Sequence, residues 1–325
     1  MISIAMTTFN GSRYIIEQLD SILHQTVLPD EVIICDDRSS DSTVQLVEDY
    51  IERNALSNWR ISVNEKNLGW KQNFRRAVSM TKGDIVFFAD QDDIWMPWKL
   101  EEMSALMIKH NMGCLYGECI KIDADGKELR ERNSINNFSN SLNKIDFSPS
   151  FFSVGGLGCC MCVHRRVITK YLQLDVAIDD HDSQCPRIAV LYDTLWHLDK
   201  AVIKYRIYSG NTSGISSQYS YGSSDLKHRV DDIKSICTWL SVVLNDLEEE
   251  DARKHLIRKL IKLQNSRVSY LMGEKGNCFQ LIKQKSYYPD MTMLIGDIAY
   301  RHRMNKTLGK LRWKLEKIRT QHRER

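Results

Sequence analysis

The sequence of 325 residues has no uninterrupted apolar stretch of the roughly 18 residues that a helix needs to cross a bilayer. Its first residues, MISIAMTTFN, lack the basic segment and the small-residue cleavage site of a secretory signal peptide. The nine cysteines show no repeating spacing, and the CCMC cluster at 159–162 has no second CxxC motif or Cys/His pair at zinc spacing. We therefore expect a cytoplasmic protein with reduced, buried thiols.

The net charge of +3 is unevenly distributed. Residues 301–325 contain ten Lys or Arg and two Glu, whereas the first 300 residues contain 35 basic and 40 acidic side chains. Apolar residues recur in this tail at alternating spacings of four and three. Three interpretations remain open: a basic amphipathic helix on an anionic membrane surface, a coiled-coil seam for self-association, or a helix docked on the body. No recognition module for nucleic acid accompanies the basic residues, so we expect no nucleic-acid partner.

The first 110 residues alternate between strand-like and helix-like patterns. Strands are expected at 2–8, 31–37, 61–66 and 85–89, with helices between them. This alternation predicts an α/β fold, a Rossmann-like and mostly parallel central sheet flanked by helices. Ligands of such sheets bind at the carboxyl ends of the strands. The polar residues expected to share that edge are Thr7, Thr8, Asn10, Asp36, Asp37 and the carboxylates at 90–93.

Domain organisation follows from a change of pattern. The pattern is looser from about 113 to 215, and after 220 glycines are few and helical periodicity is strong. Ser, Tyr and Gly cluster near 218–224. We predict an α/β domain at 1–220 and a helical C-terminal region at 221–325.

Three carboxylates follow the apolar segment 85–89 within four residues. Asp90, Asp92 and Asp93 repel one another, and burying them is costly unless a cation joins them. A strand followed by Asp-x-Asp is typical of a site that holds Mg²⁺ or Mn²⁺ against a diphosphate. The alternative is a helix cap or a solvated loop, but one Asp suffices for a cap. The cluster therefore favours a divalent metal.

Glycine-rich phosphate loops are missing. No GxxxxGK[ST] and no GxGxxG follows a predicted strand, which argues against a P-loop NTPase and a dinucleotide-dependent oxidoreductase. A diphosphate must then be held by the metal and by basic side chains. Lys71, Arg75 and Arg76 are candidates, although each could instead belong to a solvated helix face.

Four ordered blocks resemble family 2 glycosyltransferases: TTFNGSRYIIEQLDSILHQT, EVIICDDRSSDST, NEKNLGWKQNFRRAV and GDIVFFADQDDIWMPWKL. The resemblance is strong over 1–110 and weak over 150–215. It implies the GT-A fold, a nucleotide-sugar donor and inversion of the anomeric centre. DQDDIW followed by KL is most similar to bacterial rhamnosyltransferases of surface polysaccharide assembly. The nucleotide-sugar half would be 1–110 and the acceptor half 111–220.

The resemblance also implies site residues on the donor side. Thr7 and Phe9 would line the base pocket with Asn10 beside them, and Asp37 would accept a hydrogen bond from a pyrimidine. Gly69 would let the backbone approach the donor. Asp90 would lie near the ribose, while Asp92 and Asp93 would bind the metal. Trp95 is expected to serve packing rather than substrate stacking.

A base must deprotonate the acceptor hydroxyl. Family members carry it as Asp or Glu at the start of a helix, and IDDHDSQC at 178–185 offers Asp179, Asp180 and Asp182. Asp182, from the His-Asp pair, is the first choice and Asp180 the second, with helix capping as the remaining alternative. His181 is either an orienting neighbour of the base or a polar residue of the capping region.

Further along, YRIYSGNTSG at 205–214 resembles an element that lies near the diphosphate in this family. Arg206 would neutralise phosphate and Asn211 is retained. Tyr208 stands where a His is usual, so the metal or phosphate contact of that His is not carried over.

The sequence thus predicts a metal-dependent inverting hexosyltransferase of polysaccharide biosynthesis. The leading donor is dTDP-rhamnose, with a UDP-hexose as the alternative, and the acceptor is a glycan on a lipid carrier. A sugar-1-phosphate nucleotidyltransferase would carry a Gly-rich, Arg/Lys-containing loop after the first strand, which this chain lacks. A non-catalytic nucleotide-sugar or glycan-binding module is the non-enzyme alternative. A membrane-bound tail would make the protein peripheral on the inner face of the cell membrane.

Overall fold

The computed structural model describes residues 1–129, 138–174, 180–208, 226–248, 251–274 and 278–302. The chain forms two compact units. The first contains residues 1–147 and 154–211, and the second contains 148–153 and 212–325. The predicted boundary near 220 lies outside the described residues and stays a prediction. The sequence pattern did not indicate that the short segment 148–153 belongs to the second unit.

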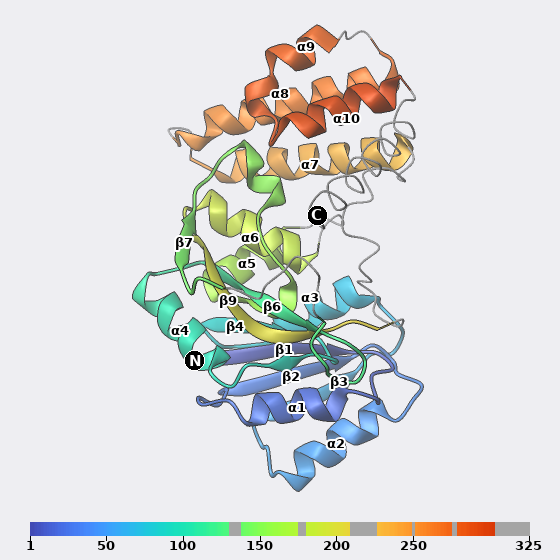
Figure 1. Cartoon of the computed structure of the whole chain (residues 1–325), viewed down its shortest axis with the longest axis vertical. Coiled ribbons are helices and arrows are strands. Elements are labelled where there is room, and N and C mark those ends of the chain that lie inside the picture. The colour runs from blue at the N-terminus through green and yellow to red at the C-terminus, as the bar shows by residue number, and fades with distance from the viewer. Residues whose placement is uncertain (130–137, 175–179, 209–225, 249–250, 275–277, 303–325) are drawn as a thin grey trace, which may run out of the picture. The chain divides into compact units, whose positions relative to one another are not determined.

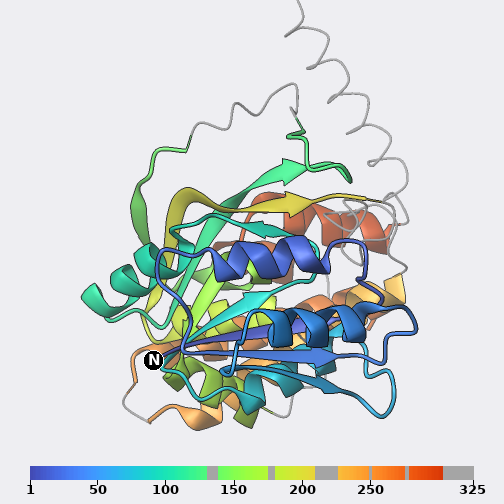
Figure 2. The ribbon, with the colours of Figure 1, turned by 90° about the horizontal axis from the view of Figure 1, so that it is seen from below.

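Nine strands of the described residues form one sheet in the order β3-β2-β1-β4-β8-β6-β9-β5, with β7 paired to β9. Figures 1 and 2 show this sheet at the centre of the first unit. The strands are β1 (Ile2–Thr8), β2 (Glu31–Asp36), β3 (Trp59–Val63), β4 (Ile85–Ala89), β5 (Ile94–Trp95), β6 (Cys114–Ile122), β7 (Leu142–Ile145), β8 (Met161–His164) and β9 (Leu195–Arg206). The first four are mutually parallel, and β8 is antiparallel to both β4 and β6. The predicted mostly parallel sheet is confirmed.

Helices cover both faces of the parallel half, and this explains the apolar composition of its strands. All five residues of β4 and all six of β2 are buried, as expected for parallel strands with both faces covered. In Figure 1, α1 (Ile15–Leu23) and α2 (Thr43–Arg53) lie below the sheet, and α3 (Trp70–Met80), α5 (Arg165–Gln173) and α6 (His181–Leu191) lie above it. The helix α4 (Lys99–Lys109) follows β5.

The second unit is helical, as predicted for the C-terminal region. It contains α7 (Leu226–Asp246), α8 (Arg253–Met272), α9 (Cys278–Lys283) and α10 (Met291–Arg301). The completely buried Asp297 of α10 accepts hydrogen bonds from Arg229 of α7, Arg267 of α8 and the Tyr288 hydroxyl. This network joins three helices. No helix of the described residues is long and apolar enough to cross a membrane.

All nine cysteines are free thiols, and six of them are buried. The three cysteines of the CCMC cluster, Cys159, Cys160 and Cys162, are among the buried ones, as expected. Short 3-10 segments connect the larger elements: η1 (Pro149–Ser153), η2 (Gly158–Cys160) and η4 (Lys285–Tyr287). Of these, η2 lies beside the end of β4 and forms part of the candidate site.

Candidate active site

The carboxyl ends of β1 and β2 are joined by short hydrogen bonds. Asp36, at the end of β2, accepts from the Thr8 hydroxyl at 2.6 Å and from the Ser39 amide at 2.7 Å. Asn10 has a left-handed backbone with φ 49°, its amide donates to the Ser39 hydroxyl, and its side-chain oxygen accepts from the Ser40 amide at 2.8 Å. Asn10, predicted to contact the donor, thus joins the two loops of the rim.

Asp37 fixes the turn that precedes α3. Its Oδ1 accepts from the Leu68 amide and the Asn64 side chain, both at 2.7 Å, and its Oδ2 accepts from the Gly69 amide at 2.8 Å. A carboxylate offers about four acceptor positions, so about one remains for a ligand. Gly69 has φ 77° and no atom within 4 Å of the position where a Cβ would lie. Glycine suits this backbone conformation, and the space beside it is open.

Gln91 clamps the loop after β1, a role that the sequence did not reveal. Its side-chain amide accepts from the Phe9 amide at 2.8 Å and donates to the Phe9 carbonyl at 3.1 Å. A Cβ on Gly11 would lie 2.2 Å from the Gln91 Oε1, so a larger residue there would displace the Gln91 amide from Phe9. The Phe9 ring is 47% exposed, whereas Thr7 is 8% exposed. Only Phe9 of this pair presents a side chain broadly to solvent.

The three carboxylates after β4 differ in exposure and in partners. Asp90 and Asp92 are half-buried, and Asp93 has no exposed surface. The Tyr208 hydroxyl donates to the Asp92 Oδ2 at 2.9 Å, and the Arg206 amide donates to the Asp93 Oδ1 at 3.2 Å. The other oxygen of Asp93 has no hydrogen-bond partner within the described part of the chain.

Burial and mutual repulsion make these carboxylates weak acids. Burial, followed by the charges of Asp92 and Asp182, raises the pKa of Asp90 to about 7. Burial also raises the pKa of Asp92, although the Tyr208 hydrogen bond and the Arg206 charge act in the opposite direction. Burial, followed by the charges of Asp92 and Asp90, raises the pKa of Asp93 well above its usual value. A cation at this position would relieve the repulsion.

One group of possible ligand atoms is assembled here. Oxygens of Asp90 and Asp93 and the Cys159 thiol lie within 4.8 Å of one another. The predicted pair of Asp92 and Asp93 is therefore divided, because the Asp93 carboxylate faces Asp90 and the Asp92 carboxylate contacts Tyr208. The unpartnered Asp93 oxygen fits a hard cation. The Cys159 thiol is soft and buried, so it suits Mg²⁺ or Mn²⁺ less well than the carboxylates do.

Two buried cationic side chains, Lys99 and Arg206, lie close to the three carboxylates after β4. Lys99 is completely buried, its Nζ donates to the Cys159 carbonyl at 2.6 Å, and the same atom lies 3.5 Å from the centroid of the Trp95 ring. Burial lowers the pKa of Lys99 to about 8. Trp95 is 2% exposed and therefore serves packing, as the sequence suggested.

Arg206 is the second cation and is 1% exposed. Its Nε donates to the Asp92 carbonyl at 2.8 Å, a terminal nitrogen pairs with Glu17, and the guanidinium lies 4.4 Å from the centroid of the Tyr14 ring. The guanidinium predicted to bind phosphate is thus engaged with protein groups in this structure. Asn211 lies outside the described residues.

The start of α6 carries the two candidate bases in different roles. Asp180 is the N-cap of the helix, accepts from the Ser183 amide at 3.0 Å and lies 3.6 Å from the Lys71 ammonium. Asp182 lies in the first turn, and 33% of its side chain is exposed. The capping role that the sequence left open thus belongs to Asp180. Asp179 lies outside the described residues.

The three basic residues of α3 that the sequence offered as phosphate ligands have different partners. The Arg75 guanidinium donates to the Tyr171 carbonyl at 3.0 Å, and Arg76 donates to the Ser62 hydroxyl at 2.8 Å. Lys71, whose side chain is 46% exposed, is the member of the three that points to the start of α6. It is the remaining phosphate candidate of this set.

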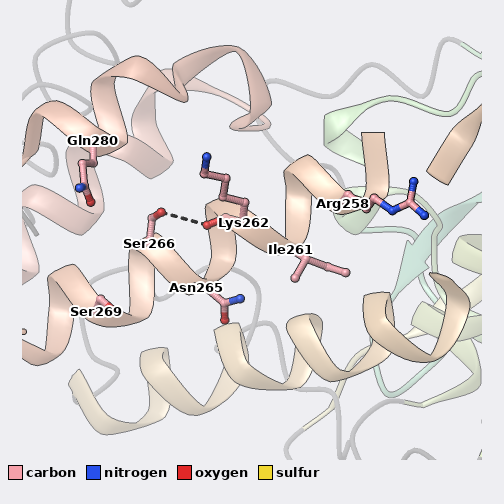
Figure 3. A pocket seen from close by; sticks show the side chains of 7 residues that line it. All are labelled: Arg258, Ile261, Lys262, Asn265, Ser266, Ser269 and Gln280. Carbon is pink, nitrogen blue, oxygen red and sulfur yellow. Dashed lines mark hydrogen bonds between the residues drawn. The ribbon is translucent and has the colours of Figure 1, made fainter. Parts of the chain in front are cut away.

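A separate hollow of about 400 Å³ lies in the second unit, along α8 and the start of α9 (Figure 3). It is lined by Arg258, Ile261, Lys262, Asn265, Ser266, Ser269 and Gln280. Within it the Ser266 hydroxyl donates to the Lys262 carbonyl at 2.9 Å. It contains no predicted site residue and no carboxylate, so it offers none of the chemistry of the rim.

Comparison with known proteins decides the family. The model of glycosyl transferase family 2 matches residues 3–172, more than half of the chain. The chain belongs to this family. As the sequence blocks indicated, the protein is therefore a glycosyltransferase, and the α/β unit is its GT-A domain.

The curated relatives of this glycosyltransferase include two bacterial transferases. One, named dTDP-rhamnosyl transferase RfbG, from Shigella flexneri, is 26% identical over 225 residues, which cover 66% of this chain and 75% of the relative. The other, named UDP-Glc:alpha-D-GlcNAc-diphosphoundecaprenol beta-1,3-glucosyltransferase WfgD, from Escherichia coli, is 29% identical over 168 residues, which cover 52% of this chain and 61% of the relative.

A crystal structure of residues 1–349 of S. aureus TarS in complex with UDP-GlcNAc matches with a TM-score of 0.58 and 23% sequence identity. The match covers 87% of this glycosyltransferase and 79% of that chain. The similarity of the two folds supports the GT-A assignment.

Proposed function

We propose that this glycosyltransferase transfers a sugar from a nucleoside-diphosphate donor to a glycan acceptor, with inversion at the anomeric carbon. One observation carries the proposal. The His181 ring, next to Asp182 at the start of α6, stacks on Phe88 of β4 with centroids 4.3 Å apart, so Asp182 lies close to the strand end that carries Asp90. A partly exposed carboxylate suited to deprotonate an acceptor is thereby brought to the strand end where a donor would bind.

The donor would lie across the ends of β1, β2 and β4. The exposed Phe9 ring offers a surface for a pyrimidine base, and Asp37 has about one acceptor position left for a base N–H. The open space beside Gly69 lets backbone and donor approach closely. Asp90 would accept hydrogen bonds from the ribose hydroxyls, and Lys71 would reach toward the diphosphate.

A divalent metal, Mn²⁺ or Mg²⁺, would be held by the half-buried carboxylates of Asp90 and Asp92. Asp93, predicted as a ligand, supports this pair from the buried side, where its unpartnered oxygen faces Asp90 and Cys159. When bound, the metal offsets the negative charge of the departing diphosphate.

In the transfer step Asp182 accepts the proton of the acceptor hydroxyl. That oxygen forms a bond to the anomeric carbon while the bond from this carbon to the diphosphate oxygen breaks, and its electron pair leaves with the diphosphate. Asp182 is ionised before the step and protonated after it. Its 33% exposure leaves the carboxylate accessible to an acceptor from solvent.

The donor sugar and the acceptor are inferred from the relatives. The likeness to RfbG favours dTDP-rhamnose, and the likeness to WfgD supports a UDP-hexose as the alternative. A glycan on a lipid carrier is the inferred acceptor, in assembly of a surface polysaccharide. The basic tail would then hold the enzyme at an anionic membrane; residues 303–325 of that tail lie outside the described residues.

The test is to incubate the protein with Mn²⁺ and, in turn, dTDP-rhamnose, UDP-glucose and UDP-GlcNAc, and to measure release of the nucleoside diphosphate. We expect release from one donor, lost in Asp92→Ala and reduced about 10²- to 10⁴-fold in Asp182→Asn. Asp84→Asn is the matched control. Asp84 directly precedes β4, at the end of the strand opposite the Asp cluster, and its carboxylate pairs with the N-terminal amine. Donor binding without release, even with a lipid-linked glycan acceptor present, would favour the non-catalytic module. Pyrophosphate production from a nucleoside triphosphate would instead favour a nucleotidyltransferase.

A further inference from the structure

His181 occupies a slot lined by aromatic rings beside the candidate base. The residue is 1% exposed, its ring stacks on Phe88 with centroids 4.3 Å apart, and the Phe74 ring lies 4.2 Å away on centroids. The edge of Trp70 is near the same ring. Apolar surroundings of this kind disfavour a polar ring unless its nitrogens find a partner.

The partner is the carboxylate of the next residue. The His181 Nε2 lies 2.7 Å from the Asp182 Oδ1. This is a close charge contact whose angles do not meet hydrogen-bond geometry, and neither atom has a hydrogen-bond partner within the described residues; the Asp182 Oδ2 is left available to receive a proton. Because the imidazole ring is packed against both Phe74 and Phe88, its nitrogen is held in place more firmly than that of an exposed side chain would be.

The backbone opposite this pair is shaped to admit it. A Cβ on Gly158 would lie 2.1 Å from the Asp182 Oδ1 and 2.3 Å from the His181 Nε2. A Cβ on Gly155, which has φ 113°, would meet the Asp182 carbonyl oxygen at 3.1 Å. Gly158 therefore leaves the room in which the two side chains meet, and Gly155 lets its segment pass close to the Asp182 backbone.

The charges around His181 favour its protonated form. Burial by itself lowers the pKa of His181, but the charges of Asp182, Asp90 and Asp180 outweigh it and raise the pKa above the ordinary value. The nearby cation is Lys71, which lies over the Trp70 ring and beside Asp180. Its positive charge acts against protonation of His181. A positive ring at this position offsets the repulsion between Asp182 and the carboxylates after β4.

We propose that His181 is a positioning residue for the transfer reaction: packed against Phe74 and Phe88, its ring orients the Asp182 carboxylate next to the donor motif. This rests on the proposed function, in which Asp182 is the base. The base role of Asp182 and the positioning role of His181 can be tested separately, because in this proposal His181 acts through Asp182 and contacts neither donor nor acceptor.

Two variants test the role. His181→Phe fills the slot with a ring that cannot donate, and His181→Gln keeps an N–H near the position of Nε2. We expect kcat for the accepted donor to fall about 10- to 100-fold in His181→Phe, with the donor KM within about twofold. The acid limb of the kcat–pH profile should move to higher pH. His181→Gln should recover part of the rate, and circular dichroism melting checks that both variants fold.

Imidazole NMR reads the contact without any turnover. Long-range ¹H–¹⁵N spectra, with His181 assigned by its loss in His181→Phe, should show a proton retained above the usual pH range in the wild type and lost at lower pH in Asp182→Asn. Unchanged kcat and pH profile in His181→Phe, with Asp182→Asn inactive, would overturn the positioning role alone. Full activity of Asp182→Asn would instead overturn the base assignment, and a His181 titration indifferent to Asp182→Asn would refute the pairing itself.

Discussion

Asp90→Asn should stabilise the protein at alkaline pH while it abolishes turnover. In the folded protein the pKa of Asp90 is about 7, raised by burial and by the carboxylates of Asp92 and Asp182, against an ordinary value of 3.8. Between these two values the folded state binds more protons at this residue than the unfolded state does. Folding stability therefore falls as pH rises from about 4 to 7 and is constant above. Asparagine is neutral throughout and removes that slope.

The magnitude follows from the shift. A tenfold change in an equilibrium constant corresponds to about 1.4 kcal/mol, so the rise of the Asp90 pKa from 3.8 to about 7 lowers folding stability by up to about 4 kcal/mol above pH 7. Asp90 is half-buried, and solvent screening reduces this to about 2 kcal/mol. For a folding unit of about 200 residues, a change of this size raises the midpoint of thermal unfolding by about 4–8 °C.

The assay is thermal unfolding followed by circular dichroism at pH 5 and pH 8, with EDTA present. The difference between Asp90→Asn and wild type should be several-fold larger at pH 8 than at pH 5. Asp84→Asn, at the opposite end of β4, should show no such dependence. In a second set of melts, with Mn²⁺ in place of EDTA, the metal should stabilise the wild type at pH 8 more than it stabilises Asp90→Asn. An equal effect at both pH values, or destabilisation at pH 8, would refute the repulsion argument.

Three further predictions concern the metal and the packing. Donor binding measured by calorimetry should collapse in EDTA and return with Mn²⁺; donor affinity that survives chelation would contradict a metal at Asp90 and Asp92. Gly158→Ala should lower kcat by at least about tenfold in nucleotide-release assays, because its Cβ would displace the Asp182 oxygen 2.1 Å away; wild-type kinetics would show that the pair tolerates movement. Asp297→Ala should destabilise the helical unit by about 3–5 kcal/mol in urea unfolding, since Arg229 and Arg267 would lose a buried partner, and a loss under 1 kcal/mol would contradict that view.

Local patterns anticipated the parallel half of the sheet well. The predicted strands 2–8 and 85–89 coincide with β1 and β4, and 31–37 exceeds β2 by one residue. A buried parallel strand consists of apolar and β-branched residues bounded by turns, and this signal is local. A strand leading into a helix within 155–167 was expected and is β8, but its antiparallel direction and its place between β4 and β6 were not anticipated, because the looser pattern of 113–215 does not specify which strands pair.

For the candidate site, too, the sequence predicted some features and not others. The polar rim and the Asp cluster followed from residue types directly behind predicted strands. Their individual partners did not: Gln91 clamps Phe9, Lys99 lies under Trp95, and the Arg206 guanidinium binds carbonyls and Glu17 instead of lying free for phosphate. These are contacts across up to 189 residues of sequence, which periodicity cannot reveal.

By itself the sequence determined the family, through the blocks of family 2, and it indicated the residues that we propose for the chemistry, the DQDD carboxylates and the His-Asp pair at 181–182. It could do so because a strand, a helix start and a motif are each contained in one short segment. Only the tertiary structure decided how the carboxylates are shared. It buries Asp93, leaves Asp92 on Tyr208, makes Asp180 the cap and brings Asp182 toward Asp90. Exposure, repulsion and pKa depend on what surrounds a group in space, and those neighbours come from β4, η2, α6 and β9 together.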